Sequence, residues 1–127
     1  MSSNTNRPLS PHLQVYKLPL LANLSILHRM TGAALSIGGL MIAWWLVAAA
    51  LGEDQYNIAM NFIRSPLGIF MMFGWSFSFY YHLFNGVRHL IWDTGRMFKL
   101  KHAYFSGYVV LLLTVLATAA TWYDVYN

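Results

Sequence analysis

The chain has 127 residues, of which 57% are hydrophobic and only 9% are charged, and its formal net charge is +4. A soluble domain is typically about a quarter charged, so this composition excludes an ordinary water-soluble protein. The absence of cysteine excludes disulfide bonds and iron–sulfur ligation by this chain, and a basic balance on so apolar a chain indicates membrane topology rather than nucleic-acid binding.

The first 29 residues are polar and contain Pro8, Pro11 and Pro19. They show no short apolar core followed by small residues, which is the pattern of a cleaved secretory signal, and no Arg/Ser-rich presequence precedes Arg7. The prolines predict an irregular or short interfacial segment over residues 7–20 rather than one long helix.

Three transmembrane helices are predicted from the gaps between formal charges. Residues 30–52, 65–87 and 102–123 form uncharged stretches of 23, 23 and 22 residues. About 20 apolar residues cross a hydrocarbon core, and a helix satisfies its own backbone hydrogen bonds there. We therefore expect one all-α membrane domain, residues 1–127, with spans at about 30–52, 66–91 and 103–123. Asp93 and Gly95 mark the expected end of the second span's helix.

The basic residues predict the orientation of these spans. Seven of the eight Lys and Arg residues precede the first span or lie at or beyond the end of the second. The one remaining cation, Arg64, lies on the other side with Glu53, Asp54 and Asp124. Because cytoplasmic loops are enriched in Lys and Arg, the N-terminus is expected in the cytoplasm or its organellar equivalent.

His82 is an ionisable residue inside the second predicted span, roughly 9 Å from its centre at 1.5 Å per residue. Such a group is costly at this depth and is usually functional. It could bond a neighbouring helix, join a proton path or ligate a haem iron. Gly86, one turn away, would leave room for a porphyrin, which favours haem without excluding the other two interpretations.

Spacing indicates that this chain supplies only one axial ligand of such a haem. His82 and His89 share a face but stand roughly 10 Å apart along the helix, whereas two nitrogens across one iron are about 4 Å apart. His28 is expected at the cytoplasmic end of the first span, too shallow to face His82. A six-coordinate haem then needs a ligand from another chain. Haem propionates could be neutralised at the cytoplasmic level, by a cluster of His28, Arg29, Arg88 and His89.

Ser25 and Arg29 are four residues apart and therefore neighbours on one helix face. One interpretation is an arginine that extends its charged end to the membrane interface. The other is a quinone site, in which a hydroxyl and a guanidinium hold a quinone oxygen as charge builds on it during reduction. Residue spacing alone leaves both open.

Three segments carry a resemblance to a known family: residues 7–13 (RPLSPHL), 25–32 (SILHRMTG) and 82–93 (HLFNGVRHLIWD). They resemble the cytochrome b subunit of succinate dehydrogenase, the larger of the two membrane anchors of respiratory complex II. The resemblance runs from Arg7 through the third predicted span, and the opening segment is similar to the mitochondrial and related bacterial branch.

The resemblance implies specific roles. In the family, the two anchors hold one b-type haem between them with one axial histidine from each chain, and the matching position here is His82. Ser25 and Arg29 match the quinone-site serine and arginine, and Ile26 lies in the same pocket. His28 and Arg29 match residues near the haem propionates, and the spacing argument adds His89 there.

The resemblance also implies partners: a second membrane anchor within a hetero-oligomeric helix bundle, an iron–sulfur subunit that delivers electrons to ubiquinone, and a flavoprotein subunit that holds the succinate site. The missing presequence favours a bacterial protein, or one encoded inside an organelle, over a nucleus-encoded mitochondrial one. We expect the bacterial inner membrane, with the inner membrane of an organelle that encodes the protein as the alternative. The alternatives are an anchor of fumarate reductase, with electrons flowing the other way, and a non-catalytic membrane scaffold.

Overall fold

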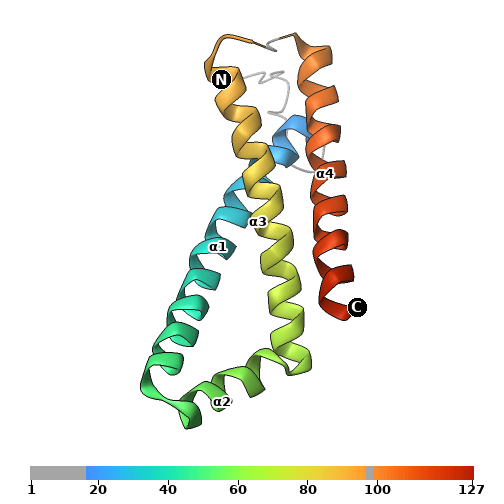
Figure 1. Ribbon diagram of the computed structural model, residues 1–127. Helices are drawn as coiled ribbons and strands as arrows, with labels where there is room; N and C mark the ends of the chain where they lie inside the picture. Colours follow the sequence, from blue (N-terminus) through green and yellow to red (C-terminus); the bar gives the residue numbers. More distant parts are fainter. Residues whose placement is uncertain (1–16, 97–98) are drawn as a thin grey trace, which may run out of the picture.

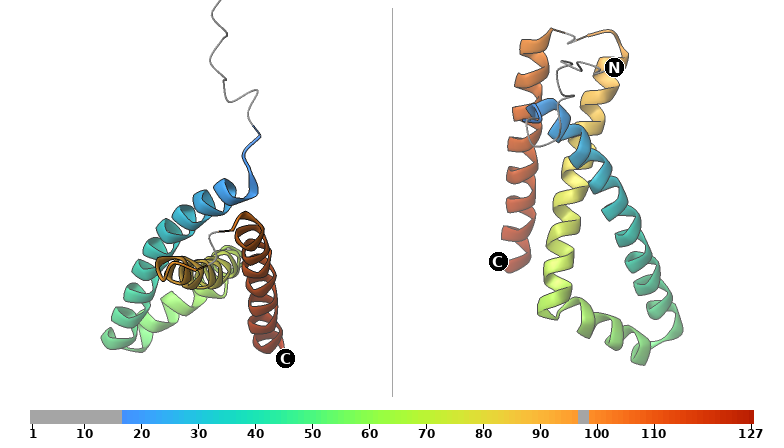
Figure 2. Two further views of the ribbon diagram at one scale, coloured as in Figure 1. Left: turned by 90° about the horizontal axis from the view of Figure 1, so that it is seen from above. Right: turned by 180° about the vertical axis from the view of Figure 1, so that it is seen from behind.

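The computed structural model describes residues 17–96 and 99–127. Four helices follow one another along the chain: α1 (Leu20–Leu51), α2 (Glu53–Ile63), α3 (Pro66–Asp93) and α4 (Leu100–Tyr126). No strand occurs in these residues, which confirms the all-α prediction. The helix α3 lies between α1 and α4, and the short α2 joins the far ends of α1 and α3 (Figure 1, Figure 2).

Two of the described helices, α1 and α4, are both long and apolar enough to cross a membrane. With 28 residues, α3 is long enough to cross a membrane, and its bounds lie close to the predicted range 66–91. Its Ser, Tyr, Trp and His residues, however, lower its mean hydropathy. The third span therefore stays a prediction. Large apolar side chains face outward along the helices, for example Leu40 at 72% and Phe70 at 73% exposure, as expected for contact with lipid.

The helix α1 begins ten residues before the predicted first span. Pro19 precedes it in an extended conformation, and its carbonyl oxygen accepts hydrogen bonds from the backbone N–H groups of Ala22 and Asn23. The predicted start was too late because it was taken from the first residue after Arg29, where the uncharged stretch begins. The helix itself continues through Arg29 without interruption. Within the predicted irregular segment, residues 7–16 lie outside the described residues, and residues 17–19 belong to no helix, which agrees with the prediction.

The helix α2 was not predicted. Gly52, with φ of 117°, turns the chain at the end of α1, and Glu53 and Asp54 then occupy the first turn of α2, where negative charge is stabilised by the helix dipole. A second turn leads into α3, where the Ser65 hydroxyl accepts a hydrogen bond from the N–H of Gly68 at 3.1 Å. At the other end α3 stops at Asp93 and Gly95 has φ of 79°, which confirms the expected break.

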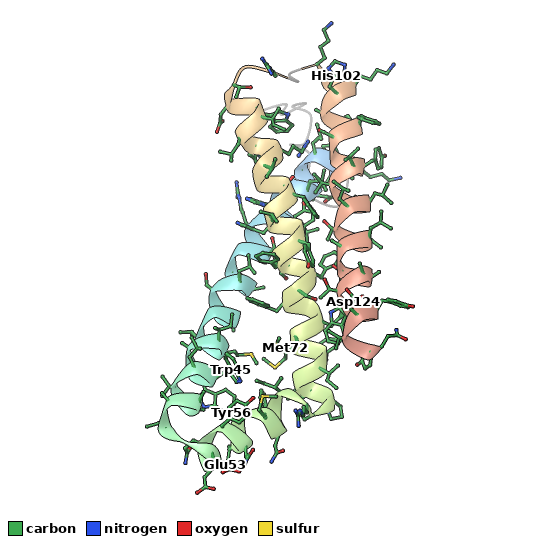
Figure 3. The ribbon with its side chains drawn as sticks, viewed as in Figure 1. Trp45, Glu53, Tyr56, Met72, His102 and Asp124 are labelled. Atoms are coloured by element: carbon green, nitrogen blue, oxygen red, sulfur yellow. The ribbon has the colours of Figure 1, made fainter. Side chains whose placement is uncertain are left out.

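The core lies where α1, α3 and α4 meet, and it is centred on Leu24, Tyr81 and Val110. The fully buried Tyr81 donates a hydrogen bond from its hydroxyl to the Leu24 carbonyl oxygen at 2.7 Å, which ties the first turns of α1 to the middle of α3. From this junction α1 and α3 separate toward α2 (Figure 1). Glu53 and His102 mark opposite ends of the molecule, as Figure 3 shows.

Candidate functional site

Three histidines come together at the junction of α1 and α3. The rings of His28 and His82 are stacked, with centroids 3.9 Å apart and planes only 8° from parallel. The ring of His89 lies 5.3 Å from that of His28, at an angle of 58°. The structure therefore brings His28 and His89 together as predicted, and it adds His82 to the same group.

The predicted depth of His28 is wrong. We expected it to be too shallow to face His82, but the two rings lie at the same level because α1 begins early and crosses α3 at an angle (Figure 2). They nevertheless do not form a ligand pair. Two axial ligands point their nitrogens at a common metal, whereas these rings face one another with their flat sides. That this chain supplies only one axial ligand stays a prediction.

The hydrogen bonding of His82 leaves one ring nitrogen available. Its Nδ1 lies 3.1 Å from the His28 carbonyl oxygen, and because a carbonyl only accepts, Nδ1 carries the proton. The Thr31 hydroxyl lies 3.3 Å from the same nitrogen. Nε2 has no hydrogen-bond partner among the described residues. Metal-binding histidines commonly donate their second ring N–H to a backbone carbonyl, which fixes the ring and the tautomer.

Two glycines shape the surroundings of this ring. A Cβ on Gly32 would lie 3.1 Å from Cε1 of His82, so α1 approaches the imidazole as closely as glycine permits. A Cβ on Gly86 would meet nothing within 4 Å, so α3 offers open space one turn beyond His82. A half-buried imidazole with a free Nε2 beside an open helix face fits a haem iron with its porphyrin.

The predicted quinone residues lie on the first turns of α1. Ser25 is half-buried, Arg29 is exposed and Ile26 is 44% exposed. Neither the Ser25 hydroxyl nor the Arg29 guanidinium bonds to any residue that the structure describes. Both groups are thus available to a ligand, and they stand one helical turn apart.

Comparison with known proteins decides the family. The family described as succinate dehydrogenase/fumarate reductase transmembrane subunit matches residues 3–121. The chain belongs to this family. The cytochrome b556 subunit of succinate dehydrogenase from Paracoccus denitrificans is 42% identical over 116 residues, which cover 91% of this chain and 89% of that protein.

Two further relatives agree. The cytochrome b556 subunit from Rickettsia felis is 39% identical, with 91% of this chain and 90% of that protein covered. The human mitochondrial cytochrome b560 subunit is 40% identical, with 90% and 69% covered. The family resemblance drawn from the sequence is confirmed, and the chain is a transmembrane subunit of an oxidoreductase complex.

In this member of the family Arg88 does not join the predicted propionate cluster. It lies six residues beyond His82, which places it about 120° around α3, and its side chain enters the interface with α4. Nε donates to the Ser106 hydroxyl at 2.9 Å, Nη2 to the Ala103 carbonyl at 3.0 Å and Nη1 to Oδ1 of Asn85 at 3.1 Å. The guanidinium also covers the Trp92 ring at 4.1 Å. Only 5% of the residue is exposed, and none of its described hydrogen bonds goes to a histidine.

Sequence reasoning missed several residues of the site. Thr31 contacts the His82 ring, and Asn85, fully buried between Arg88 and His89, was noted only at the edge of a polar stripe. The one available signal for Asn85 was its spacing, because residues three and four apart are neighbours on a helix.

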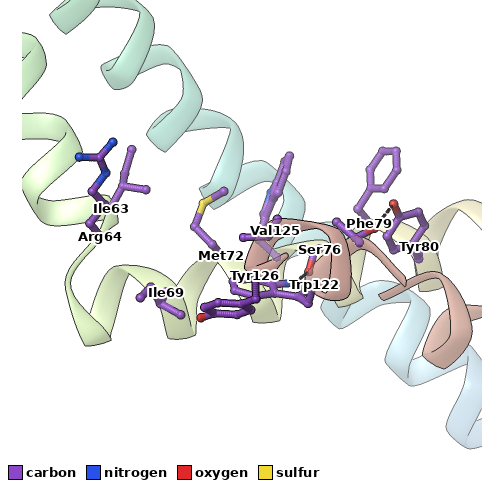
Figure 4. A pocket seen from close by; sticks show the side chains of 12 residues that line it. Ile63, Arg64, Ile69, Met72, Ser76, Phe79, Tyr80, Trp122, Val125 and Tyr126 are labelled. Atoms are coloured by element: carbon purple, nitrogen blue, oxygen red, sulfur yellow. Dashed lines mark hydrogen bonds between the residues drawn. The ribbon is translucent and has the colours of Figure 1, made fainter. Parts of the chain in front are cut away.

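Two hollows lie away from these residues. One of about 660 Å³ separates α2, the beginning of α3 and the end of α4, where Figure 4 shows Trp122 donating its ring N–H to the Ser76 hydroxyl at 2.9 Å. A second of about 440 Å³ lies among α1, α2 and α3. Both are lined mainly by apolar side chains, and neither contains a predicted haem or quinone residue.

Proposed function

We propose that this chain is the membrane anchor of a succinate dehydrogenase that binds one b-type haem with a second anchor chain and helps form the site of ubiquinone reduction. One observation carries the proposal. The His82 ring donates its Nδ1–H to a carbonyl of α1, so that Nε2 is free beside the open space at Gly86. The names of the relatives, which are cytochrome b556 and b560 subunits of succinate dehydrogenase, support the haem and the direction of electron flow.

His82 is the proposed ligand of the haem iron, and the second anchor chain would supply the opposite histidine. When bound, the haem provides a group that accepts and returns one electron at a time. The chain's own task is orientation: the His28 carbonyl fixes the tautomer of His82, and the flat side of the His28 ring supports it. His28, His89 and Arg29 are proposed to face the propionate carboxylates with N–H donors.

Ser25, Ile26 and Arg29 are the proposed quinone contacts. A quinone oxygen gains negative charge on reduction, and a guanidinium and a hydroxyl one turn apart stabilise that charge by donating hydrogen bonds. Ile26, which is exposed beside them, offers an apolar contact to the quinone ring. The electrons would come singly from an iron–sulfur subunit, and a flavoprotein subunit would hold the succinate site.

The proposed topology has three spans with the N-terminus in the cytoplasm, in the inner membrane of a bacterium. The distribution of charge supports it. Lys17 precedes α1, and Lys99 and Lys101 lie at the start of α4 beside His102, whereas Glu53 and Asp54 begin α2 at the opposite end of the molecule (Figure 3). Fumarate reductase remains the second candidate, because the family description covers both enzymes.

The haem proposal is tested by purifying the whole complex with His82→Ala and recording its reduced absorption spectrum. We expect the b-type haem bands to be lost. His102→Ala is the matched control, because His102 is exposed at the start of α4 and should keep the bands. Haem retained at the normal ratio in His82→Ala would overturn the ligand assignment, and a colourless wild-type complex would favour a non-catalytic scaffold.

The quinone proposal is tested with Arg29→Leu. Succinate oxidation by ubiquinone should fall at least tenfold, while succinate oxidation by a soluble dye should persist, since the dye takes electrons before they reach the membrane. Arg64→Leu, which removes the cation at the other end of the molecule, should change neither rate. Equal loss of both rates in Arg29→Leu would assign Arg29 to assembly of the complex instead.

A further inference from the structure

Arg88 is a buried cation whose described hydrogen-bond partners are all uncharged: the Asn85 amide, the Ser106 hydroxyl and the Ala103 carbonyl. Burial of an arginine is costly unless its donors are satisfied, and here acceptors on two helices fix the plane of the guanidinium. The fixed guanidinium in turn affects Asn85, whose side chain lies between Arg88 and His89.

Arg88 determines which way the Asn85 amide points. The two ends of an amide have nearly the same shape, but one only accepts hydrogen bonds and the other only donates. A guanidinium only donates, so the atom 3.1 Å from Nη1 must be the amide oxygen. The NH2 group of Asn85 is therefore turned to the other side, where it lies 3.3 Å from Nε2 of His89.

The same reasoning then fixes the proton of His89. Because the Asn85 NH2 group donates, Nε2 of His89 must accept, and it carries no proton. A neutral imidazole carries one proton, so the proton is on Nδ1. The other tautomer, or the imidazolium, would place an N–H of His89 against an N–H of Asn85. Among the described residues, Nδ1 of His89 has no hydrogen-bond partner.

We propose that Arg88 and Asn85 are positioning residues that hold His89 as a neutral ring with Nδ1–H as its donor, directed to a carboxylate oxygen. This identification of the acceptor as a haem propionate rests on the proposed function, whereas the tautomer of His89 does not. Through Ser106 and Ala103 the relay also gives α4 a part in the site, although α4 contributes none of the histidines of the group.

The tautomer is tested by nitrogen-15 NMR of the whole complex with labelled histidine, because the two neutral tautomers differ in which ring nitrogen carries the proton. His89→Gln identifies the His89 signals by removing them. Asn85→Asp is the decisive variant: it has nearly the same shape and still accepts from Arg88, but it turns an acceptor toward His89. We expect Nε2 of His89 to become protonated in this variant.

The matched control is Thr114→Ala. It removes a buried hydroxyl of α4 that bonds only the Val110 carbonyl of its own helix, about two turns beyond Ser106, so the His89 signals should not change. A proton on Nε2 in the wild type, or unchanged signals in Asn85→Asp, would overturn the relay. The wild-type measurement decides the matter alone if the aspartate variant does not assemble.

The acceptor is tested by the midpoint potential of the haem. His89→Gln keeps an N–H donor and His89→Leu does not, so the potential should fall in His89→Leu and stay closer to the wild-type value in His89→Gln. Equal potentials in the two variants would overturn the propionate as the acceptor while leaving the tautomer intact. Absence of haem in the wild type would instead overturn the proposed function.

Discussion

Replacing Gly32 with alanine should loosen the haem without unfolding the chain. A Cβ at this position would lie 3.1 Å from Cε1 of His82, whereas carbon atoms in favourable contact are about 3.5–4.0 Å apart. The ring must therefore move away from α1 by roughly 0.5 Å. The His28 carbonyl that accepts the Nδ1–H of His82 at 3.1 Å also belongs to α1. The same movement stretches this bond to about 3.6 Å, which is no longer a hydrogen bond.

The size of the effect follows from the role of that bond. Loss of a hydrogen bond that orients a metal ligand typically costs about 10–100-fold in metal affinity. Helix stability does not fall, because alanine is favoured over glycine by up to about 1 kcal/mol in a helix. We expect Gly32→Ala complexes to assemble and to lose haem at least tenfold faster to an excess of a haem-scavenging protein.

Gly39→Ala is the control for this experiment. It adds the same methyl group to the same helix, and nothing lies within 4 Å of it. Haem should leave this variant at the wild-type rate. The reasoning would be refuted by equal rates in Gly32→Ala and Gly39→Ala, since that would show that the His82 ring does not depend on its close approach to α1.

Three further variants, one of them with its own control, test the packing of α1 and α3. Gly86→Ala adds a methyl group that meets none of the described residues within 4 Å, so reduced haem content would show that a ligand or partner fills this space. The control is Gly74→Ala, which is equally open and also on α3, and it should leave the haem content unchanged. Tyr81→Phe removes a buried hydroxyl bond to α1 and should lower the free energy of unfolding by about 1 kcal/mol, measured in mixed micelles. In Gly38→Ala the new methyl group would overlap the Trp75 ring, so the free energy of unfolding should fall by about 1–3 kcal/mol. An unchanged free energy of unfolding would contradict the close packing of α1 on α3 at this position.

The sequence located α3 well and α1 less well, for physical reasons. Gly95 is a strong local signal, because glycine favours the left-handed conformation that ends a helix, and it lies two residues beyond Asp93. Pro66, the first residue of α3, is a second local signal that the prediction from charge gaps did not use. Gaps between charges show where the apolar sequence begins and ends. A helix can begin earlier or end later than the apolar sequence, as α1 does at Leu20. For the same reason the eleven polar and apolar residues of α2 were taken as part of a connection between spans.

The candidate site residues were chosen one by one from the sequence, and their arrangement in space was not predicted. His82 was singled out because an ionisable group is rare at its expected depth. The stacking of His28 on His82 was missed, because the prediction placed the helices upright and parallel, while α1 crosses α3 at an angle that no local pattern encodes. Arg88 was grouped with the histidines only because it lies at a similar level along its helix. The direction of its side chain depends on hydrogen-bond acceptors in α4, which no local sequence pattern predicts.

The first turns of α1 connect the two proposed sites mechanically. On its packed side Leu24 is held by the Tyr81 hydroxyl and by contact with Gly107 of α4, where any Cβ would collide with the leucine. Four residues on, the carbonyl of His28 orients the His82 ring. Ser25 and Arg29 follow these two residues directly, so each lies about 100° around the helix from an anchored neighbour. The contacts that hold Leu24 and His28 therefore position both the proposed quinone donors and His82, the proposed haem ligand. A displacement of this segment should change the haem spectrum and quinone reduction together. Ser25→Ala, which removes a quinone donor that faces no propionate, should change quinone reduction alone.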